Sequence, residues 1–414
     1  MMASLAVGMD FYEKEVYVGL WDNEEHCSKS FTVPAKSAGE RIPLFVVPFA
    51  NGDFVAGQEG IVWSRNNDCE GATALYGKHI SEQLMVNGNL YDVTDLLAGF
   101  LGDVLSAVSK CFGGASVARI CITGERMNPE DERRLSVALM KIGFERENFF
   151  IINHANAFLR YMISTDEIRR RQWAVDIDMG TRGSEAYAYN PADRSHGFPA
   201  YVEHSEETPL MQVTIENIPE ITAKAEAFDN LVAQVLIQNK NATFLYVTGR
   251  AAEDECIKEV MRKYASPSLK IFSGKNLYFS GACYRAQDER PRDMMLEDGD
   301  VFHTVSVSVY RDAVIDSIPL VNAGCPLDKA KGKIYLIPDN TNKVVFTIKD
   351  LRTGRTETVI FPLEDLVNRE NKTNRLEVTA SFPDIKTLVI KVRDLGFGDI
   401  YPATYRVCEQ TLKL

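Results

Sequence analysis

The stretch WAVDIDMGTRGSEAYAY, residues 173–189, repeats the layout with which the chain begins. It predicts a strand over residues 173–177, a turn after Asp176, and a hairpin partner over residues 185–189. Residues 6–21, AVGMDFYEKEVYVGLW, predict the same arrangement around Asp10. Two hairpins of one layout, each at the start of a series of strands and helices, predict a duplicated α/β architecture.

The segments that follow each hairpin alternate between strands and helices. The Asn51-Gly52 pair predicts a tight hairpin between short strands. Asn128 and Pro129 have the residue types of a helix cap and first helical position, so a helix is expected from there to about residue 142. The other predicted elements are helices over residues 92–112, 155–163, 221–236 and 253–264, and strands over residues 117–123, 149–152 and 244–247.

The helical period disappears after about residue 300, where short strands are separated only by turns. This spacing predicts a β-sandwich over residues 301–414. The predicted organisation is an α/β domain over residues 1–286, with halves of about 1–168 and 169–286. A charged linker is predicted over residues 287–300, and the fold class is α/β plus all-β.

Composition excludes several classes of protein. The chain has 414 residues and a formal net charge of −12, which disfavours nucleic acid and anionic membranes as partners. The 8 cysteines show no metal-ligand spacing, so we expect neither a metal site nor a disulfide framework. No apolar run reaches the roughly 18 residues of a membrane span, and a cytoplasmic location is expected.

Several segments together resemble the DnaK-type heat-shock chaperones. Val7-Gly8-Met9-Asp10 and the segment from Val175 to Thr181 are similar to that family's two phosphate hairpins, and Tyr246-Val247-Thr248-Gly249 is similar to its adenosine-side turn. Met294-Met295-Leu296 resembles its interdomain linker. The resemblance covers almost the whole chain in order, and it implies an actin-like ATPase fold followed by a peptide-binding β-sandwich, in a divergent bacterial member of unknown function.

The resemblance also implies functional positions. The candidates for nucleotide and Mg²⁺ are Asp10, Asp176, Gly180, Thr181 and Gly249, where the carboxylates would hold a hydrated Mg²⁺. The candidates for a peptide groove are Val307, Val309 and Val321. These three valines also have the alternation of a sandwich core, which is the preferred interpretation.

Other positions depart from the family at residues that would contact or hydrolyse ATP. The first hairpin turn carries Glu13 and Glu15, whose charges should repel ATP. The family's phosphate-contacting lysine falls on Ile61 and its catalytic glutamate on His154. Two glycines of the second hairpin become Asp178 and Met179. The span of residues 183–243 is also too short for the family's adenine-binding helical subdomain, and the chain ends at Leu414 without its helical lid.

These departures leave alternatives for single residues. Asp10 and Asp176 are either metal-bridging carboxylates or polar residues retained at strand ends, and the second interpretation is preferred. His154 is either an acid or base near neutral pH or a hydrogen-bonded structural residue, and again the second is preferred. No catalytic residue and no metal ligand is assigned.

The function expected from the sequence is that of a degenerate DnaK-like protein, a non-catalytic protein-binding or scaffolding module with a protein or peptide partner. One alternative is a chaperone ATPase that uses ATP and Mg²⁺ with an unusual active site. Another is a sensor that binds a small ligand in the actin-like cleft. The departures disfavour ATP, for which we expect no binding tighter than about millimolar, or ~4 kcal/mol.

Overall fold

The computed structural model describes residues 4–73, 75–77, 82–287, 295–311, 314–363, 369 and 371–414. It is mixed α/β, with about 29% helix and 39% strand in several sheets. The chain forms two compact units, an α/β unit (Met1–Pro191 and Val202–Arg292) and a β unit (Ala192–Tyr201 and Asp293–Leu414). Met294 and the rest of residues 288–294, half of the predicted linker, lie outside the described residues.

The first sheet of the α/β unit is built around β1, which pairs antiparallel with β2 and parallel with β9. The strand order is β10-β9-β1-β2-β3, with β4 on β2. The bounds are β1 Leu5–Phe11, β2 Glu15–Asp22, β3 Cys27–Ser30, β4 Arg41–Pro43, β9 Val117–Gly124 and β10 Phe149–Asn153. Two small hairpins accompany this sheet: β5 Val46–Pro48 with β6 Phe54–Ala56, and β7 Gln83–Val86 with β8 Asn89–Asp92.

The second sheet repeats this order around β11, which pairs antiparallel with β12 and parallel with β14. Its order is β15-β14-β11-β12-β13. The bounds are β11 Ala174–Gly180, β12 Gly183–Asn190, β13 Ala200–His204, β14 Phe244–Thr248 and β15 Lys270–Ser273. The duplicated layout predicted from the two opening hairpins is therefore confirmed at the level of strand order.

Helix α3 begins where the sequence signals place it, whereas these signals do not predict α1 and α5, and α7 begins two residues later than expected. Asn128 caps α3, because its side chain accepts hydrogen bonds from the N–H groups of Glu130 and Asp131, and Pro129 is the first helical residue. The bounds are α1 Gly57–Asn67, α2 Val93–Cys111, α3 Pro129–Lys141, α4 His154–Ser164, α5 Glu167–Arg170, α6 Ile221–Gln238, α7 Glu255–Tyr264 and α8 Leu277–Gln287.

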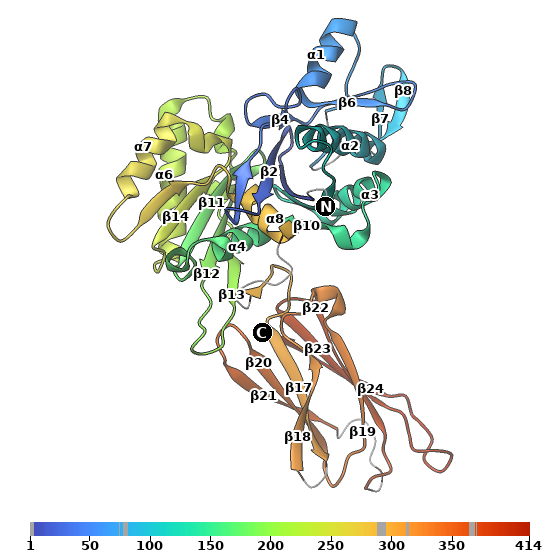
Figure 1. Ribbon diagram of the computed structural model, residues 1–414. Helices are drawn as coiled ribbons and strands as arrows, with labels where there is room; N and C mark the ends of the chain where they lie inside the picture. The colour runs from blue at the N-terminus through green and yellow to red at the C-terminus, as the bar shows by residue number, and fades with distance from the viewer. Residues whose placement is uncertain are drawn as a thin grey trace. The chain divides into compact units, whose positions relative to one another are not determined.

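Helices α4 and α8 lie side by side between the two sheets (Figure 1). Helix α8 contacts β1, β2 and β9 of the first sheet, and α4 contacts β12 of the second. The helices approach so closely that a Cβ at Gly281 would lie 1.9 Å from the carbonyl oxygen of Ala157, which explains the glycine. This close approach brings the N-terminal ends of α4 and α8 together, with His154 on one and Tyr278 on the other.

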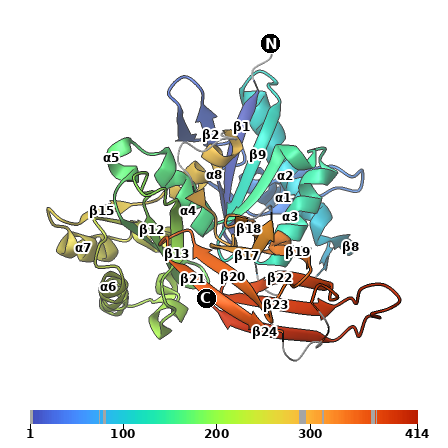
Figure 2. The same cartoon turned by 90° about the horizontal axis from the view of Figure 1, so that it is seen from below.

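The β unit consists of two four-stranded antiparallel sheets, which can be followed in Figure 2. One has the order β18-β17-β20-β21 and the other β19-β22-β23-β24. Alternate apolar residues of both sheets form one core, the pattern of a sandwich. The bounds are β16 Met295–Leu296, β17 His303–Arg311, β18 Val314–Val321, β19 Lys331–Leu336, β20 Lys343–Asp350, β21 Thr356–Pro362, β22 Leu376–Asp384, β23 Thr387–Asp394 and β24 Val407–Lys413.

Among the described helices, none is both long enough and apolar enough to span a lipid bilayer.

Candidate functional site

Charged side chains from both sheets meet in the interior of the α/β unit. Asp10 lies near the end of β1, Asp176 and Asp178 lie on β11, and His154 is the first residue of α4. All four side chains are buried, with His154 only 1% exposed. Such a concentration of ionisable groups needs internal partners, because burial of an unpaired charge is costly.

His154 bridges the two sheets. Its Nε2 atom lies 2.8 Å from Asp10 Oδ1, and its Nδ1 atom lies 2.7 Å from Asp178 Oδ2. The ring of Tyr278 stacks on the imidazole at 3.7 Å between centroids, and Tyr12 lies 5.7 Å away on another side. Both ring nitrogens are therefore used, and the imidazole is held within hydrogen-bond distance of two carboxylates.

The electrostatics favour a protonated His154. Burial lowers the pKa of His154, but the carboxylates of Asp10 and Asp178 raise it by more, so that this pKa lies well above the usual value of 6.5. The N-terminal end of a helix is an unfavourable place for a cation. Two carboxylates at hydrogen-bond distance outweigh that effect, so the imidazolium form of His154 is favoured.

Asp176 contacts Tyr278, the residue whose ring stacks on His154. Burial and the charge of Asp178 raise the pKa of Asp176 well above its usual range, which favours the neutral acid. The hydroxyl of Tyr278 donates a hydrogen bond to Asp176 Oδ2, and the hydroxyl of Thr248 lies 3.4 Å from the same atom. The carboxyl group is thus held by α8 and β14.

The turn between β11 and β12 holds a carboxylate of the protein itself. Glu125 follows β9 of the first sheet, and its side chain accepts hydrogen bonds from Thr181 Oγ1 (2.7 Å) and from the N–H of Arg182 (2.8 Å). The Arg182 guanidinium donates to the carbonyl oxygens of Glu125 and Arg126. Glu125 is only 1% exposed, so its carboxylate is fully enclosed by this turn.

Both candidate glycines have a structural reason to be glycine. A Cβ at Gly180 would lie 2.4 Å from Glu125 Oε1, so a larger residue would exclude the carboxylate. Gly249 has φ +86, and a Cβ there would lie 2.1 Å from the carbonyl oxygen of Met179. Neither position requires a ligand to explain it.

The first hairpin turn carries less uncompensated negative charge than the sequence suggests. Glu13 is exposed, but Glu15 is half-buried, accepts a hydrogen bond from Tyr17 and lies 3.6 Å from the Arg41 guanidinium. Arg41 on β4 therefore offsets part of the charge of Glu15, so that the expected repulsion of ATP depends more on Glu13.

The three candidates for the peptide groove in the β unit differ in their surroundings. Val307 and Val321 belong to the buried sandwich core, and Val309 packs against this core while it also lines a pocket of about 590 Å³. This pocket opens beside exposed apolar side chains, with Tyr310, Tyr335 and Ile337 each more than half exposed. Most of its wall is apolar: Val309, Ile318, Ile334, Leu336, Pro338, Val344, Leu363 and Leu376.

The described part of the predicted linker contains a short strand. Met295 and Leu296 form β16, which pairs in parallel with Ala200 and Tyr201 of the same unit. Leu296 is 2% exposed. This end of the predicted linker is thus a short strand with a buried side chain and not an exposed connection.

Sequence reasoning missed Asp178, Glu125 and Tyr278. A usable signal was present for the first, because His154 and Asp178 replace an acidic and a glycine position of the resembled family together. When a basic and an acidic side chain both replace family residues in the same cleft, the two substitutes are expected to form an ion pair. Glu125 and Tyr278 carry no such signal in the sequence.

The His154 bridge predicts a specific pH dependence of stability. Because the pKa of His154 is raised on folding, its stabilising contribution is complete below the unfolded value near 6.5 and is lost as pH rises through the folded value. The free energy of unfolding should fall above pH 6.5 by up to about 1.4 kcal/mol per pH unit. Urea unfolding of the wild type and of His154→Gln from pH 6 to about pH 9 measures the difference; parallel curves would contradict the prediction.

Within the described part of the chain, no three His, Cys, Asp or Glu side chains are arranged to hold a metal ion.

Comparison with known proteins gives two matches. A family described as "Family of unknown function (DUF5716) C-terminal" matches residues 28–296, well over half of the chain. A domain described as "Domain of unknown function (DUF8552)" matches residues 300–414. No curated protein matches the chain. The boundary between the two matches lies close to the division between the α/β unit and the β unit.

Proposed function

The chain belongs to the family of unknown function DUF5716, and we propose that it is a non-catalytic protein-binding or scaffolding protein. In this proposal the α/β unit is a degenerate actin-like fold of the DnaK type, whose cleft is closed by the protein's own side chains. The β unit supplies a surface for a protein or peptide partner.

The duplicated strand order supports an actin-like fold. β1, β2, β9 and β10 have the same pairing directions as β11, β12, β14 and β15. In folds of this kind a cleft lies between the halves, and residues at the ends of the central strands face it. Asp10, the second-last residue of β1, has this position, whereas Asp176 is the third residue of β11, which continues to Gly180 without a turn directly after Asp176.

The observation that carries the proposal is the position of His154. A hydrated Mg²⁺ in the cleft would need the oxygens of Asp10 and its neighbours, but Asp10 and Asp178 already hold the imidazolium at 2.8 and 2.7 Å. A second cation beside the imidazolium would be repelled. The residues present therefore do not fit a Mg²⁺–nucleotide complex.

Glu125 gives independent support. Backbone N–H groups and hydroxyls in a tight turn bind anions, and the turn at Thr181 and Arg182 already holds the Glu125 carboxylate. A phosphate at this turn would have to displace a buried carboxylate. The chaperone-ATPase alternative is thus disfavoured by both hairpins.

Binding to a partner is assigned to the pocket of the β unit. It combines an apolar wall with β18, an edge strand of its sheet in the order that the described residues form. Peptide capture by addition to a sheet edge needs free backbone groups and a pocket for alternate side chains. Ile315 on β18 is 77% exposed beside Val314 and its cross-strand partner Tyr310, which are also exposed, and a contiguous exposed apolar group of this kind marks interaction sites.

We predict weak and rapidly exchanging binding of short apolar peptides. No lid among the described residues closes over this pocket, and affinity differences among related complexes lie mostly in the rate of dissociation. Fluorescence anisotropy with labelled apolar heptapeptides should show binding weaker than about 10 µM, or ~7 kcal/mol, that equilibrates within the mixing time. Tyr335→Ser and Ile337→Ser should each weaken it.

The matched control is Tyr405→Ser, which removes an exposed tyrosine of the β unit that does not line the pocket. If Tyr405→Ser weakens peptide binding as much as the pocket variants do, the binding is due to general surface hydrophobicity and not to the pocket. Slow dissociation that responds to ATP would contradict the proposal and favour a chaperone ATPase.

A further inference from the structure

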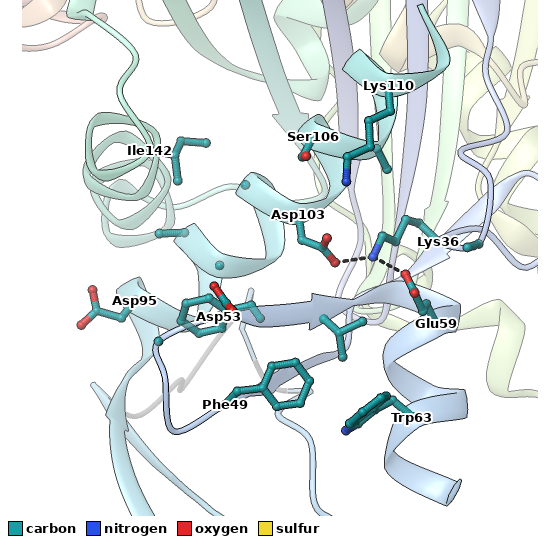
Figure 3. A pocket seen from close by; sticks show the side chains of 18 of the residues that line it. Lys36, Phe49, Asp53, Glu59, Trp63, Asp95, Asp103, Ser106, Lys110 and Ile142 are labelled. Carbon is teal, nitrogen blue, oxygen red and sulfur yellow. Dashed lines mark hydrogen bonds and ion pairs between the residues drawn. The ribbon is translucent and has the colours of Figure 1, made fainter. Parts of the chain in front are cut away.

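A pocket of about 980 Å³ in the α/β unit lies apart from the His154 bridge (Figure 3). Its walls come from the β5–β6 hairpin, α1, α2 and the C-terminal end of α3. This volume is at the upper end of what small-molecule sites and side-chain pockets have. Nothing in the proposed function uses it.

One end of the pocket is aromatic. Phe49 and Trp63 meet edge to face, with ring centroids 5.3 Å apart, and Trp63 is 44% exposed. Both rings lie at the same end of the pocket in Figure 3. An exposed tryptophan supported by a second ring presents the electron-rich surface that attracts organic cations.

Carboxylates accompany the aromatic pair. Glu59 lies one helical turn before Trp63 on α1, so the two side chains share a face of that helix. The N–H of Phe49 donates to the carbonyl oxygen of Asp53 at 2.9 Å, which closes the hairpin, and the Asp53 carboxylate accepts a hydrogen bond from Asn51 Nδ2 at 2.6 Å. Asp53 and Glu59 are both exposed.

The one buried cation of the described lining is already neutralised. Lys36 is 4% exposed, and its amine contacts Glu59 at 2.6 Å and also Asp103. Figure 3 shows the amine between these two carboxylates. Asp103 additionally accepts the N–H of Ala56 at 2.8 Å. Lys36 therefore fixes the floor of the pocket and is not available to an anionic ligand.

The other two lysines of the pocket lining, Lys110 and Lys141, do not make the pocket favourable to an anionic ligand. Lys141 forms an ion pair with Asp95, and Lys110 comes from the last turn of α2, away from the aromatic pair in Figure 3. Counting all lining charges, four carboxylates (Asp53, Glu59, Asp95 and Asp103) face three lysines. The net charge of −12 on the whole chain also attracts cations.

The opposite wall leaves room for an extended group. It is formed by small residues of α2, and a Cβ at Gly102 would meet only Ile142 Cγ2, at 3.5 Å. An alkyl stem can lie along this wall while its charged end reaches the aromatic rings and carboxylates.

We propose that this pocket binds an arginine or lysine side chain of a partner segment, with the cationic group against Trp63 and beside Glu59 of the same helix face. The site is independent of the pocket in the β unit, so the tests of the two proposals succeed or fail separately.

The test uses ¹⁹F NMR of the full chain labelled with 5-fluorotryptophan. The chain has 3 tryptophans, Trp21, Trp63 and Trp173, and Trp63→Phe assigns the resonance of interest. Titration with the peptide acetyl-Gly-Arg-Gly-amide at low ionic strength should shift the Trp63 resonance. Trp173, which is 42% exposed outside the pocket, should not respond. Added salt should weaken the effect.

Two variants and two peptides decide the outcome. Glu59→Gln should raise the dissociation constant about two- to fivefold, whereas Glu226→Gln, a matched charge removal at an exposed position of α6, should leave it unchanged. An unmoved Trp63 resonance, or an equal response to the glutamate or norleucine analogue of the peptide, would overturn the proposal. An unchanged dissociation constant in Glu59→Gln would do the same.

Discussion

Replacement of His154 by alanine should lower the free energy of unfolding by about 3 to 5 kcal/mol, because it leaves the buried carboxylates of Asp10 and Asp178 without a cation. The cavity left by the ring, and the lost stacking on Tyr278, add to this effect. Urea unfolding near pH 6.5, followed by circular dichroism, measures the change.

The control is His196→Ala, which removes an exposed histidine that also pairs with an aspartate, Asp193. Surface ion pairs contribute at most about 1 kcal/mol, so this variant should unfold close to the wild type. The free energy of unfolding of His154→Gln should lie between those of His154→Ala and His196→Ala, because the glutamine amide keeps a hydrogen bond but not the positive charge. A His154→Ala variant as stable as His196→Ala would show that the bridge does not hold the two sheets together.

Glu125→Ala should destabilise the α/β unit by about 2 to 4 kcal/mol. The substitution removes the acceptor of the Thr181 hydroxyl and of the Arg182 N–H, and it leaves a largely buried guanidinium without its carboxylate. The amide of Arg182 should also exchange with deuterium faster than in the wild type, because its hydrogen bond is lost.

Glu132→Ala is the matched comparison for this variant, since Glu132 is exposed in the first turn of α3, the helix that follows Glu125. We expect a change within about 0.5 kcal/mol there. Unaltered exchange at Arg182 in Glu125→Ala would contradict the assignment of Glu125 as the occupant of the turn between β11 and β12.

Local signals in the sequence were sufficient for the individual elements. The cap at Asn128 and Pro129 predicts α3 correctly, and the apolar period after Asp92 predicts α2 to within one residue at each end. The repeated hairpin layout around Asp10 and Asp176 also predicts the common strand order of the two sheets. Such features depend on neighbours in sequence, which a single chain displays directly.

The site depends on residues that are distant in sequence. His154 meets Asp10 across 144 residues and Asp178 across 24, and both contacts require the register of β1 and β11 and the close approach of α4 and α8. The sequence shows that family positions are substituted, but it does not show that the substitutes bind one another. The compensation of Glu15 by Arg41 and the enclosure of Glu125 have the same origin.

Isothermal titration calorimetry of the full-length wild type with ATP, and separately with ADP, in the presence of Mg²⁺ tests the central claim most directly. The claim is that the protein's own His154 and Glu125 occupy the places of cation and phosphate. It predicts no binding tighter than about millimolar for either nucleotide, or ~4 kcal/mol. A micromolar dissociation constant would contradict the claim and restore an ATP-dependent function.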